Sequence, residues 1–419
     1  MTENIGRVCV VGLGYIGLPT AAVIAHHGVS VLGLDVDPRI VNTLNQGRIH
    51  IVEPELDAVV RAEVVSGRFR AALQPEPADV FLIAVPTPFK NGHEPDLSYV
   101  ESAVRGIAPV LQPGNLVILE STSPVGTTEQ VVKWLAQLRP DLRVPVSDAE
   151  NSEADVYLAY CPERVLPGRV LQELVENDRV VGGITAACAE KAARFYSLFV
   201  KGECLRTNAR TAEMAKLTEN AFRDVNIAFA NELSLICDRQ DINVWELIRL
   251  ANRHPRVNIL QPGPGVGGHC IAVDPWFIVH AAPDVARLMR IARETNDGKP
   301  HWVLDQIHQA VAHAGPEAKV ACLGLAFKPD IDDLRESPAL EITVALANEG
   351  RCQVLAVEPY VDDLPPALKS LENVRAMPAE AAIAEADVVV LLVNHTAFKS
   401  IDKGLLAGKK IIDTRGMWQ

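Results

Sequence analysis

The sequence predicts an α/β protein in which two doubly wound parallel-sheet domains are joined by a long central helix. Three observations predict this fold. Short apolar runs alternate with helical patterns near both ends of the chain, as buried parallel strands and their crossover helices require. The first run leads into a glycine-rich turn at residues 12–17. Segment 211–239 contains neither glycine nor proline and has apolar residues at helical spacing.

The composition limits the possible classes of protein. The 419 residues are too many for one hydrophobic core, so two or three domains are expected. The net charge of −13 argues against binding to nucleic acid or to a membrane surface. No apolar run approaches the roughly 20 residues of a membrane-spanning helix, and no signal-like segment precedes the first expected strand. We therefore expect a cytoplasmic protein.

The eight cysteines have neither C-x-x-C spacing nor an evenly spaced framework. This pattern is typical of thiols in a reducing cytosol rather than of disulfides or a zinc site. We expect no bound metal.

The first expected strand, 8–11, runs into Gly12-x-Gly14-x-x-Gly17, and a helical pattern follows. These glycines let the backbone close on a pyrophosphate, which then lies at the positive end of the helix. A second apolar run ends at Asp35, whose carboxylate can bind ribose hydroxyls and repels a 2′-phosphate. Together these features predict a Rossmann-like domain that binds NAD rather than NADP.

Two further apolar runs, 80–85 and 116–119, end in loops punctuated by proline. Ligands bind at the carboxyl ends of such strands, so Thr87, Thr122 and Thr128 are candidate cofactor contacts. Helix capping explains each threonine equally well on its own.

Polar residues on the next loop and on the long helix are candidates for substrate binding. Glu163 and Arg164 follow an apolar run, although alone they read as a solvated surface pair. Lys216, Asn220 and Arg223 fall on one face of the expected helix. Such a stripe is usually solvated, but in a pocket it would offer two cations and an amide to an anionic substrate.

The loop 260–277 (LQPGPGVGGHCIAVDPWF) carries Cys270, with Asp274 four residues later. Small residues allow a backbone and a substrate to approach closely, so this loop is a plausible setting for a reactive thiol. A lone cysteine is more often an inert core residue. The nucleotide-type folds expected on either side favour the catalytic interpretation.

Near the C-terminus an apolar run at 319–327 is followed by a helical pattern at 338–349. Later apolar runs end at Glu358, Asn394 and Asp413. This predicts a second, shorter doubly wound sheet. It lacks Gly-x-Gly-x-x-Gly, so a second complete dinucleotide is not expected. Charged residues crowd its first turn, where they either bind an anionic ligand or are solvated: Lys328, Asp333 and Arg335.

The chain resembles the UDP-glucose/UDP-N-acetylmannosamine dehydrogenase family over essentially its full length. The resemblance is carried by VVGLGYIGLP, AVPTP, ESTSPVGTT, YCPERVLPG, EMAKLTENAFRDVNIAFANEL, RHPRVNILQPGPGVGGHCIAVDPWF and GLAFKPDIDDLRESPA. It implies an NAD-binding domain at 1–206, a central helical dimerisation domain with the cysteine loop at 207–315, and a UDP-binding domain at 316–419. It also implies a homodimer or a higher homo-oligomer.

The resemblance also implies roles for single residues. The expected NAD contacts, beside Gly12, Gly14 and Gly17, are Tyr15, Ile16, Asp35, Thr87, Thr122, Thr128 and Arg335. The expected contacts with a UDP-sugar are Arg164, Val165, Lys216, Asn220, Arg223, His254, Arg256, Gly267, Phe327 and Lys328. His254 or Arg256 is expected to reach a neighbouring subunit's pocket.

One departure concerns the substrate. The glucose branch of the family has a lysine immediately before the acid that follows its catalytic cysteine, whereas Val273 precedes Asp274 here and His269 precedes Cys270. This favours a 2-acetamido sugar, and the chain looks most like the N-acetylmannosamine branch. The configuration at C2 stays open, with UDP-N-acetylglucosamine and UDP-glucose as alternatives.

The reaction that the resemblance implies is a four-electron oxidation of C6 of the sugar, with two NAD⁺ used in turn. Cys270 adds to the aldehyde, and a second hydride loss gives a thioester that water cleaves. Lys216 and Asn220 are expected to stabilise the oxyanion. Asp274, and a desolvated Lys216, are candidates for the first deprotonation, and Glu163 for guiding the hydrolytic water.

Three other functions are weighed against this one. A 3-hydroxyacid-type dehydrogenase needs neither Cys270 nor a second nucleotide domain. A nucleotide-sugar epimerase retains its NAD and releases no NADH. A redox-sensing NAD-binding module would not need the polar residues Lys216, Asn220 and Arg223 on one face of the long helix.

Overall fold

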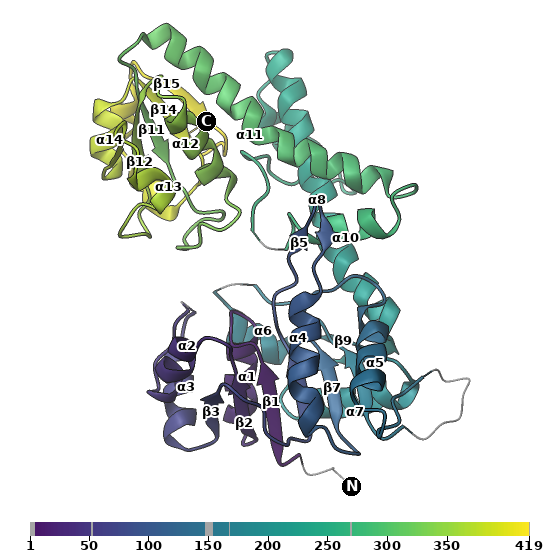
Figure 1. Ribbon diagram of the computed structural model, residues 1–419. Helices are drawn as coiled ribbons and strands as arrows, with labels where there is room; N and C mark the ends of the chain where they lie inside the picture. The colour runs from purple at the N-terminus through teal and green to yellow at the C-terminus, as the bar shows by residue number, and fades with distance from the viewer. Residues whose placement is uncertain (1–4, 52, 147–153, 167, 269, 419) are drawn as a thin grey trace. The chain divides into compact units, whose positions relative to one another are not determined.

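The computed structural model describes residues 5–51, 53–146, 154–166, 168–268 and 270–418. The chain forms two compact units, the first Met1–Glu219 and the second Asn220–Gln419. Each unit contains a mainly parallel sheet with helices packed on both faces (Figure 1). The predicted α/β fold with two doubly wound domains is confirmed.

Within the described residues, the sheet of the first unit has the strand order β10-β9-β8-β7-β4-β1-β2-β3. The strands are β1 (Arg7–Val11), β2 (Ser30–Leu34), β3 (Phe69–Ala72), β4 (Val80–Ile83), β7 (Leu116–Leu119), β8 (Tyr157–Tyr160), β9 (Arg179–Gly183) and β10 (Cys204–Asn208). The order reverses at β1, whose carboxyl end is therefore the expected ligand-binding position. β9 pairs antiparallel with β8, which departs from the predicted parallel sheet.

Helices cover both faces of this sheet. On one face lie α1 (Gly17–His26), α2 (Pro38–Asn45), α3 (Leu56–Val65), α6 (Val170–Glu176) and α7 (Ala186–Tyr196). On the other lie α4 (Ser98–Ile107), η1 (Ala108–Val110) and α5 (Thr127–Leu138). A short antiparallel pair, β5 (Phe89–Lys90) and β6 (Glu94–Pro95), extends the loop after β4.

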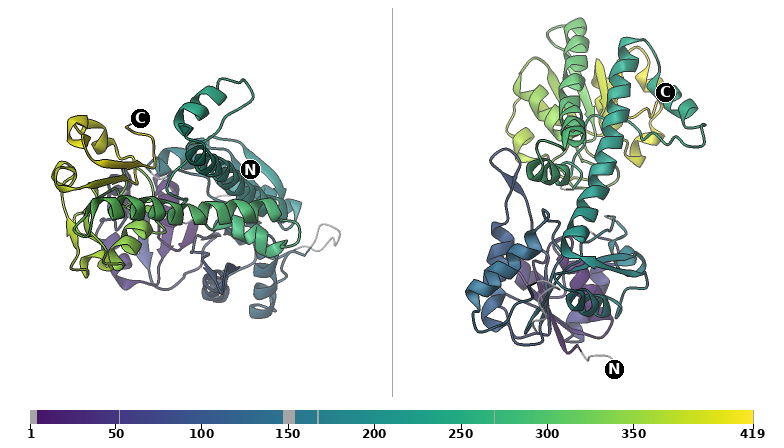
Figure 2. Two further views of the ribbon diagram at one scale, coloured as in Figure 1. Left: turned by 90° about the horizontal axis from the view of Figure 1, so that it is seen from above. Right: turned by 90° about the vertical axis from the view of Figure 1, so that its right-hand side faces the viewer.

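The predicted long helix is α8 (Ala209–Arg239), which begins in the first unit and continues into the second. The second unit adds α9 (Val244–Ala251), α10 (Asp274–Ala281) and α11 (Arg287–Ala314). α11 was not predicted, and it remains one continuous helix although Pro300 lies inside it (Figure 2). Several polar side chains of α8 recur on its buried face: Glu213, Lys216, Asn220, Asp224, Asn231 and Ser234.

Buried polar contacts join α8 to α11. Arg293 Nη1 donates to Asp224 Oδ1 at 2.6 Å, and both side chains are almost fully buried. Asn296 donates to the same carboxylate oxygen at 2.8 Å and accepts from Asn231 at 2.8 Å. Asn231 in turn accepts from the backbone N–H of Gly263 at 2.9 Å, which ties the start of the cysteine loop to both helices.

The C-terminal sheet has the order β13-β12-β11-β14-β15, and all its strand pairs are parallel. Its strands are β11 (Lys319–Leu323), β12 (Gln353–Val357), β13 (Val374–Ala376), β14 (Val388–Leu391) and β15 (Lys410–Asp413). The helices around it are α12 (Pro338–Asn348), α13 (Pro366–Lys369), α14 (Ala379–Glu385), η2 (Thr396–Ser400) and η3 (Lys403–Leu406). This is the second, shorter sheet that the sequence predicted.

Candidate active site

The turn between β1 and α1 requires glycine at two positions. A Cβ atom on Gly12, whose φ is 91°, would lie 2.6 Å from the carbonyl oxygen of Ala84. A Cβ atom on Gly17 would lie 1.8 Å from the carbonyl oxygen of Gly12. Gly14 instead faces open space, with nothing within 4 Å of a Cβ placed there. The turn is therefore closed tightly on the protein side and open where a pyrophosphate would approach.

Asp35 lies directly after β2, beside this turn. Its Oδ2 accepts a hydrogen bond from the backbone N–H of Leu13 at 3.1 Å, and its Oδ1 accepts from that of Asp37 at 2.9 Å. These bonds fix the carboxylate next to the glycine turn while the residue stays partly exposed. Tyr15 is exposed and Ile16 partly exposed on the same turn. The arrangement fits a dinucleotide with a free ribose diol.

The three threonines that were candidate cofactor contacts have protein partners. Thr87 Oγ1 donates to the carbonyl oxygen of Thr122 at 2.5 Å, which joins the loops after β4 and β7. Thr128 is buried, and its hydroxyl donates to Glu213 Oε1 at 2.7 Å. Glu213 also accepts from the backbone N–H groups of Gly126 at 2.6 Å and Thr128 at 2.8 Å.

Glu213 thus caps the N-terminus of α5 with a carboxylate from α8. Sequence reasoning missed this residue, because a glutamate in a long helix gives no sign of a partner 85 positions away. The anion-binding end of α5 is already neutralised by the protein itself. Burial raises the pKa of Glu213.

The loop after β8 brings an acid close to a buried cation. Glu163 Oε1 is buried and has no hydrogen-bond partner among the described residues. Burial raises the pKa of Glu163 from 4.5 to about 7, and the nearby positive charges of Lys216 and Arg179 act in the opposite direction. Lys216 itself is only 8% exposed. A carboxyl group that titrates near neutrality suits general acid–base chemistry.

Arg164 and Val165, which were expected to contact substrate, have contacts within the first unit. Arg164 Nη2 lies 2.8 Å from Glu219 Oε1, and its Nη1 donates to the carbonyl oxygen of Asp178 at 3.2 Å. Val165 packs against the core around α1 and α6.

In the second unit, the cysteine loop leads directly into α10. Cys270 is exposed, whereas Asp274, the first residue of α10, is 3% exposed. Asp274 Oδ2 accepts a 2.5 Å hydrogen bond from the amide of Asn220, and the Asp274 N–H donates to the carbonyl oxygen of Cys270 at 2.8 Å. His269 lies outside the described residues.

The glycines before Cys270 pack against the segment that follows β11. The N–H of Gly268 donates to the carbonyl oxygen of Glu336 at 3.2 Å. A Cβ atom on Gly267 would lie 2.3 Å from that same oxygen, and one on Gly268 would lie 2.9 Å from the ring of Phe327. Larger residues would push the cysteine loop away from this segment, which carries the predicted substrate contacts Phe327 and Lys328.

The remaining predicted contacts lie nearer the surface. Arg223, His254 and Arg256 are exposed, so only Lys216 and Asn220 of the predicted stripe on α8 are buried. Arg335, a predicted NAD contact, binds Asp333 through Nε at 2.8 Å and Nη2 at 2.6 Å.

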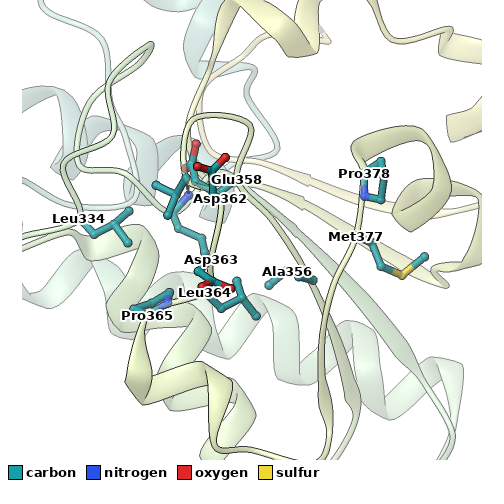
Figure 3. A pocket seen from close by; sticks show the side chains of 12 residues that line it. Leu334, Ala356, Glu358, Asp362, Asp363, Leu364, Pro365, Met377 and Pro378 are labelled. Atoms are coloured by element: carbon teal, nitrogen blue, oxygen red, sulfur yellow. Dashed lines mark hydrogen bonds between the residues drawn. The ribbon is translucent and has the colours of Figure 1, made fainter. Parts of the chain in front are cut away.

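A pocket of about 280 Å³ opens at the carboxyl ends of β12 and β13, lined by Glu358, Asp362, Asp363, Leu364 and Met377 among others (Figure 3). Glu358 follows the second strand of its sheet, as Asp35 does in the first sheet. It accepts from the N–H groups of Leu325 at 2.7 Å and Ala326 at 3.0 Å. This carboxylate therefore holds the turn after β11 in place.

Neither a membrane helix nor a metal site is found in the part of the chain that the structure describes. No helix there is long and apolar enough to cross a membrane. No group of three or more histidine, cysteine or acidic side chains there could hold a metal ion.

Comparison with known proteins assigns the chain to a family. Residues 6–200 match the NAD binding domain, 210–298 the central domain and 321–419 the UDP binding domain of the UDP-glucose/GDP-mannose dehydrogenase family. The chain belongs to this family. It is accordingly a nucleotide-sugar dehydrogenase that uses NAD, with a UDP-binding domain at its C-terminal end.

Individual relatives are similar over nearly their whole length. The NDP-N-acetyl-D-galactosaminuronic acid dehydrogenase of Ralstonia nicotianae is 62% identical over 98% of this chain and 96% of its own. The UDP-N-acetyl-D-mannosamine dehydrogenase of Escherichia coli K12 is 58% identical over 99% of this chain and 100% of its own. A solved UDP-D-ManNAc dehydrogenase from Pyrococcus horikoshii superposes with a TM-score of 0.87 at 40% identity, covering 99% of this chain and 96% of that one.

Proposed function

We propose that this protein oxidises the C6 alcohol of a UDP-2-acetamido sugar to the carboxylate, with UDP-N-acetyl-D-mannosamine as the foremost substrate. The observation that carries the proposal is the exposed Cys270 at the entrance to α10, whose first residue, Asp274, is bonded to Asn220. A single alcohol oxidation needs no such thiol. Relatives named for N-acetylmannosamine, at 58% identity, support this sugar. The 62% identical relative named for N-acetylgalactosaminuronic acid keeps the galactosamine isomer as a second candidate.

We assign the three parts of the family to residues 1–206, 207–315 and 316–419, which contain the matched segments. In the first part, the open face at Gly14 would admit the pyrophosphate of NAD, and Asp35 would hold the ribose hydroxyls. When bound, NAD accepts one hydride in each of the two oxidations. Tyr15, Ile16, Thr87, Thr122, Thr128 and Arg335 remain proposed NAD contacts.

Cys270 provides the covalent step. After the first oxidation, its thiolate adds to the C6 aldehyde and forms a C–S bond, giving a thiohemiacetal. Loss of the second hydride from C6 leaves a thioester. Water then attacks the thioester carbonyl, the C–S bond breaks, and the sulfur leaves as a thiolate while the sugar becomes a carboxylate.

Two residues of α8 would stabilise the oxyanion that forms at C6. The amide of Asn220 is held in one orientation by its 2.5 Å bond to Asp274. Lys216, four residues earlier on the same helix, supplies a buried positive charge. Fixed donors in a water-poor site stabilise developing charge more strongly than water does.

Proton transfer would be divided between two carboxyl groups. Asp274, at the start of α10, would hold the water that accepts the alcohol proton in the first oxidation. Glu163 would take the proton of the water that hydrolyses the thioester, since its pKa of about 7 lets it accept that proton at neutral pH.

The remaining proposed contacts would bind the nucleotide and sugar. They are Arg164, Val165, Arg223, His254, Arg256, Gly267, Phe327 and Lys328. We also propose a homodimer, supported by large apolar side chains that are exposed on the central helices, such as Phe222 at 67% and Phe229 at 55% on α8 and Leu250 at 61% on α9. Such side chains are often covered in an assembly.

The test measures NADH release with four substrates: UDP-N-acetylmannosamine, UDP-N-acetylglucosamine, UDP-N-acetylgalactosamine and UDP-glucose. We expect two NADH per sugar consumed and the highest kcat/KM with the mannosamine derivative. A preference for another sugar would correct the substrate but keep the chemistry. One NADH per sugar, or none, would exclude the four-electron oxidation.

A further inference from the structure

The loop that carries Glu163 runs beside the beginning of β9. β8 and β9 pair antiparallel through Ala159–Gly183 and Tyr160–Gly182. The same register, continued past the end of β8, sets residue 163 opposite Arg179. Two contacts show that the segments stay together there: Arg164 Nη1 donates to the carbonyl oxygen of Asp178 at 3.2 Å, and Asn177 Nδ2 donates to that of Arg164 at 3.1 Å.

Arg179 is buried without a carboxylate bonded to it. The residue is 1% exposed, and its Nη2 donates to the carbonyl oxygen of Leu174 at 3.2 Å. Its guanidinium carbon lies 5.3 Å from the ring centre of Tyr196. Its Nε and Nη1 have no hydrogen-bond partner among the described residues. A buried charge held this way is costly, which argues for a role beyond packing.

Other ionisable groups also act on Arg179, namely Cys161, Glu120 and Tyr196. Glu120, 2% exposed, accepts a 2.8 Å hydrogen bond from the hydroxyl of Tyr196. Burial raises the pKa of Glu120, and so favours its neutral form. The positive charge of Arg179 acts on Glu120 and on Glu163, and it lowers the pKa of both carboxyl groups.

We propose that Arg179 is a positioning residue whose buried charge, opposite Glu163, keeps that glutamate able to act as the base in thioester hydrolysis. This inference rests on the proposed function, because it deepens the role assigned to Glu163. Arg179 touches neither sugar nor coenzyme in this scheme. Arg179 acts only by changing how tightly the Glu163 carboxyl group binds its proton.

The electrostatic surroundings of Glu163 explain why a second cation matters. The charged or titratable groups that act on it come from four other elements: Lys216 of α8, Arg179 of β9, Glu120 after β7 and Glu173 of α6. Burial raises the pKa of Glu163 and so favours its protonated form, which cannot accept a proton. An opposite charge nearby lowers a carboxyl pKa by about 1–3 units. Lys216 and Arg179 together bring the pKa of Glu163 back to about 7.

The experiment compares Arg179→Met, which removes the charge, with Arg179→Lys, which retains it. Thioester hydrolysis is followed as kcat against pH, and the acyl group on Cys270 is measured by mass spectrometry of quenched reactions. In Arg179→Met we expect the midpoint of the acid limb of the kcat profile to move about one pH unit higher. At a given pH on that limb, kcat should therefore be about tenfold lower than in wild type. Activity should recover at higher pH, the acyl-enzyme should accumulate, and Arg179→Lys should restore most of the profile.

Controls separate this role from folding. Arg194→Met removes an exposed arginine of α7 and should leave the profile unchanged. The rate of the first NADH formed, and the affinity for NAD, report whether Arg179→Met is folded. Should that variant not fold, Arg179→Gln is compared with Arg179→Lys in its place: loss of the charge should raise the acid limb, and retention of the charge should not.

The outcomes decide between the two proposals. An unshifted acid limb in the variant without the charge, an equal loss of kcat at every pH, or an equal shift in Arg179→Lys would overturn the role of Arg179. A wild-type enzyme that releases one NADH per sugar, or never forms an acyl-cysteine, would instead overturn the proposed function itself.

Discussion

The amide nitrogen of Asn220 lies 2.5 Å from Asp274 Oδ2, and both residues are buried. Asn220 belongs to the long helix α8, and Asp274 begins α10 immediately after the cysteine loop. This one hydrogen bond therefore fixes the orientation of the Asn220 amide, which we propose to be catalytic, and the position of the helix that follows Cys270.

Replacing Asn220 by aspartate would place two carboxyl groups in contact. One of them would have to be protonated, and the amide donor proposed for the oxyanion would be lost. We expect Asn220→Asp to lower kcat by about 10²–10³-fold with a smaller change in KM. Steady-state kinetics test this, with Asn226→Asp on the same helix as the matched control. Retention of kcat would remove Asn220 from the catalytic scheme.

Cys270→Ser should stop the reaction after the first oxidation, because a serine hydroxyl is a far weaker nucleophile toward the aldehyde. We expect uronate formation to fall by roughly 10³-fold or more. The measurement is the yield of uronate and of NADH per sugar. Cys204→Ser, at a partly exposed thiol outside the proposed site, should behave like wild type. Uronate formed at the normal rate by Cys270→Ser would exclude the thioester route.

The raised pKa of Glu163 makes stability depend on pH. Since the pKa rises from 4.5 to about 7 on folding, the folded chain binds this proton more tightly than the unfolded chain does. The contribution of Glu163 to stability is therefore present below pH 4.5 and is lost as pH rises through about 7.

Glu163→Gln removes this dependence. The free energy of unfolding of Glu163→Gln, measured relative to that of wild type, should rise by roughly 1–3 kcal/mol between pH 4.5 and about pH 7. Thermal unfolding of both proteins across the range measures the gain, and Glu176→Gln, at an exposed site on α6, is the control. A constant difference in Tm at all pH values would contradict the buried titration. In activity assays, Glu163→Gln should accumulate the acyl-enzyme.

Asp35→Ala should weaken NAD binding and relax the exclusion of NADP. The carboxylate is held beside the glycine turn by the N–H groups of Leu13 and Asp37, where it would repel a 2′-phosphate. We expect NAD affinity to fall roughly tenfold, which corresponds to about 1.4 kcal/mol. Fluorescence titration with both coenzymes checks this against the control Asp57→Ala, at a partly exposed site on α3. If the ratio of NAD to NADP affinity does not change, Asp35 does not select the coenzyme.

Arg293→Met should destabilise the second unit by about 3–5 kcal/mol, because it leaves the carboxylate of Asp224 buried without its partner. The double variant with Asp224→Asn should recover part of this loss, since no uncompensated charge remains. Denaturant unfolding measures both, with Arg287→Met, exposed on the same helix, as the control. A loss of less than about 1 kcal/mol would mean that the pair is solvated in solution.

Local patterns predicted much of the fold. β1, β4 and β7 are continuous apolar runs in a buried sheet, and α8 contains no helix breaker, so both were predicted close to their observed bounds. α11 was missed because Gly298 and Pro300 suggest a break. Its buried face, which includes Ala292, Asn296 and Val303, is held by packing that the sequence does not reveal.

Some residues of the candidate site could likewise be predicted from local motifs, and others could not. Cys270, Asp274 and Asp35 stand in recognisable motifs, so their positions could be predicted. Glu213 and Arg179 depend on partners that are distant along the chain, namely the N-terminus of α5 and the loop after β8. The antiparallel pairing of β9 with β8, on which the proposed action of Arg179 on Glu163 rests, has no local sequence signal either.

The acid after the second strand of the C-terminal sheet repeats an arrangement of the first sheet. Glu358 already accepts hydrogen bonds from the N–H groups of Leu325, Ala326 and Tyr360. Asp35 accepts hydrogen bonds in the same pattern in the first sheet, from the N–H groups of Leu13 and Asp37. In both sheets an acid after the second strand holds the first turn in place, so a carboxylate at that position does not by itself identify a coenzyme site.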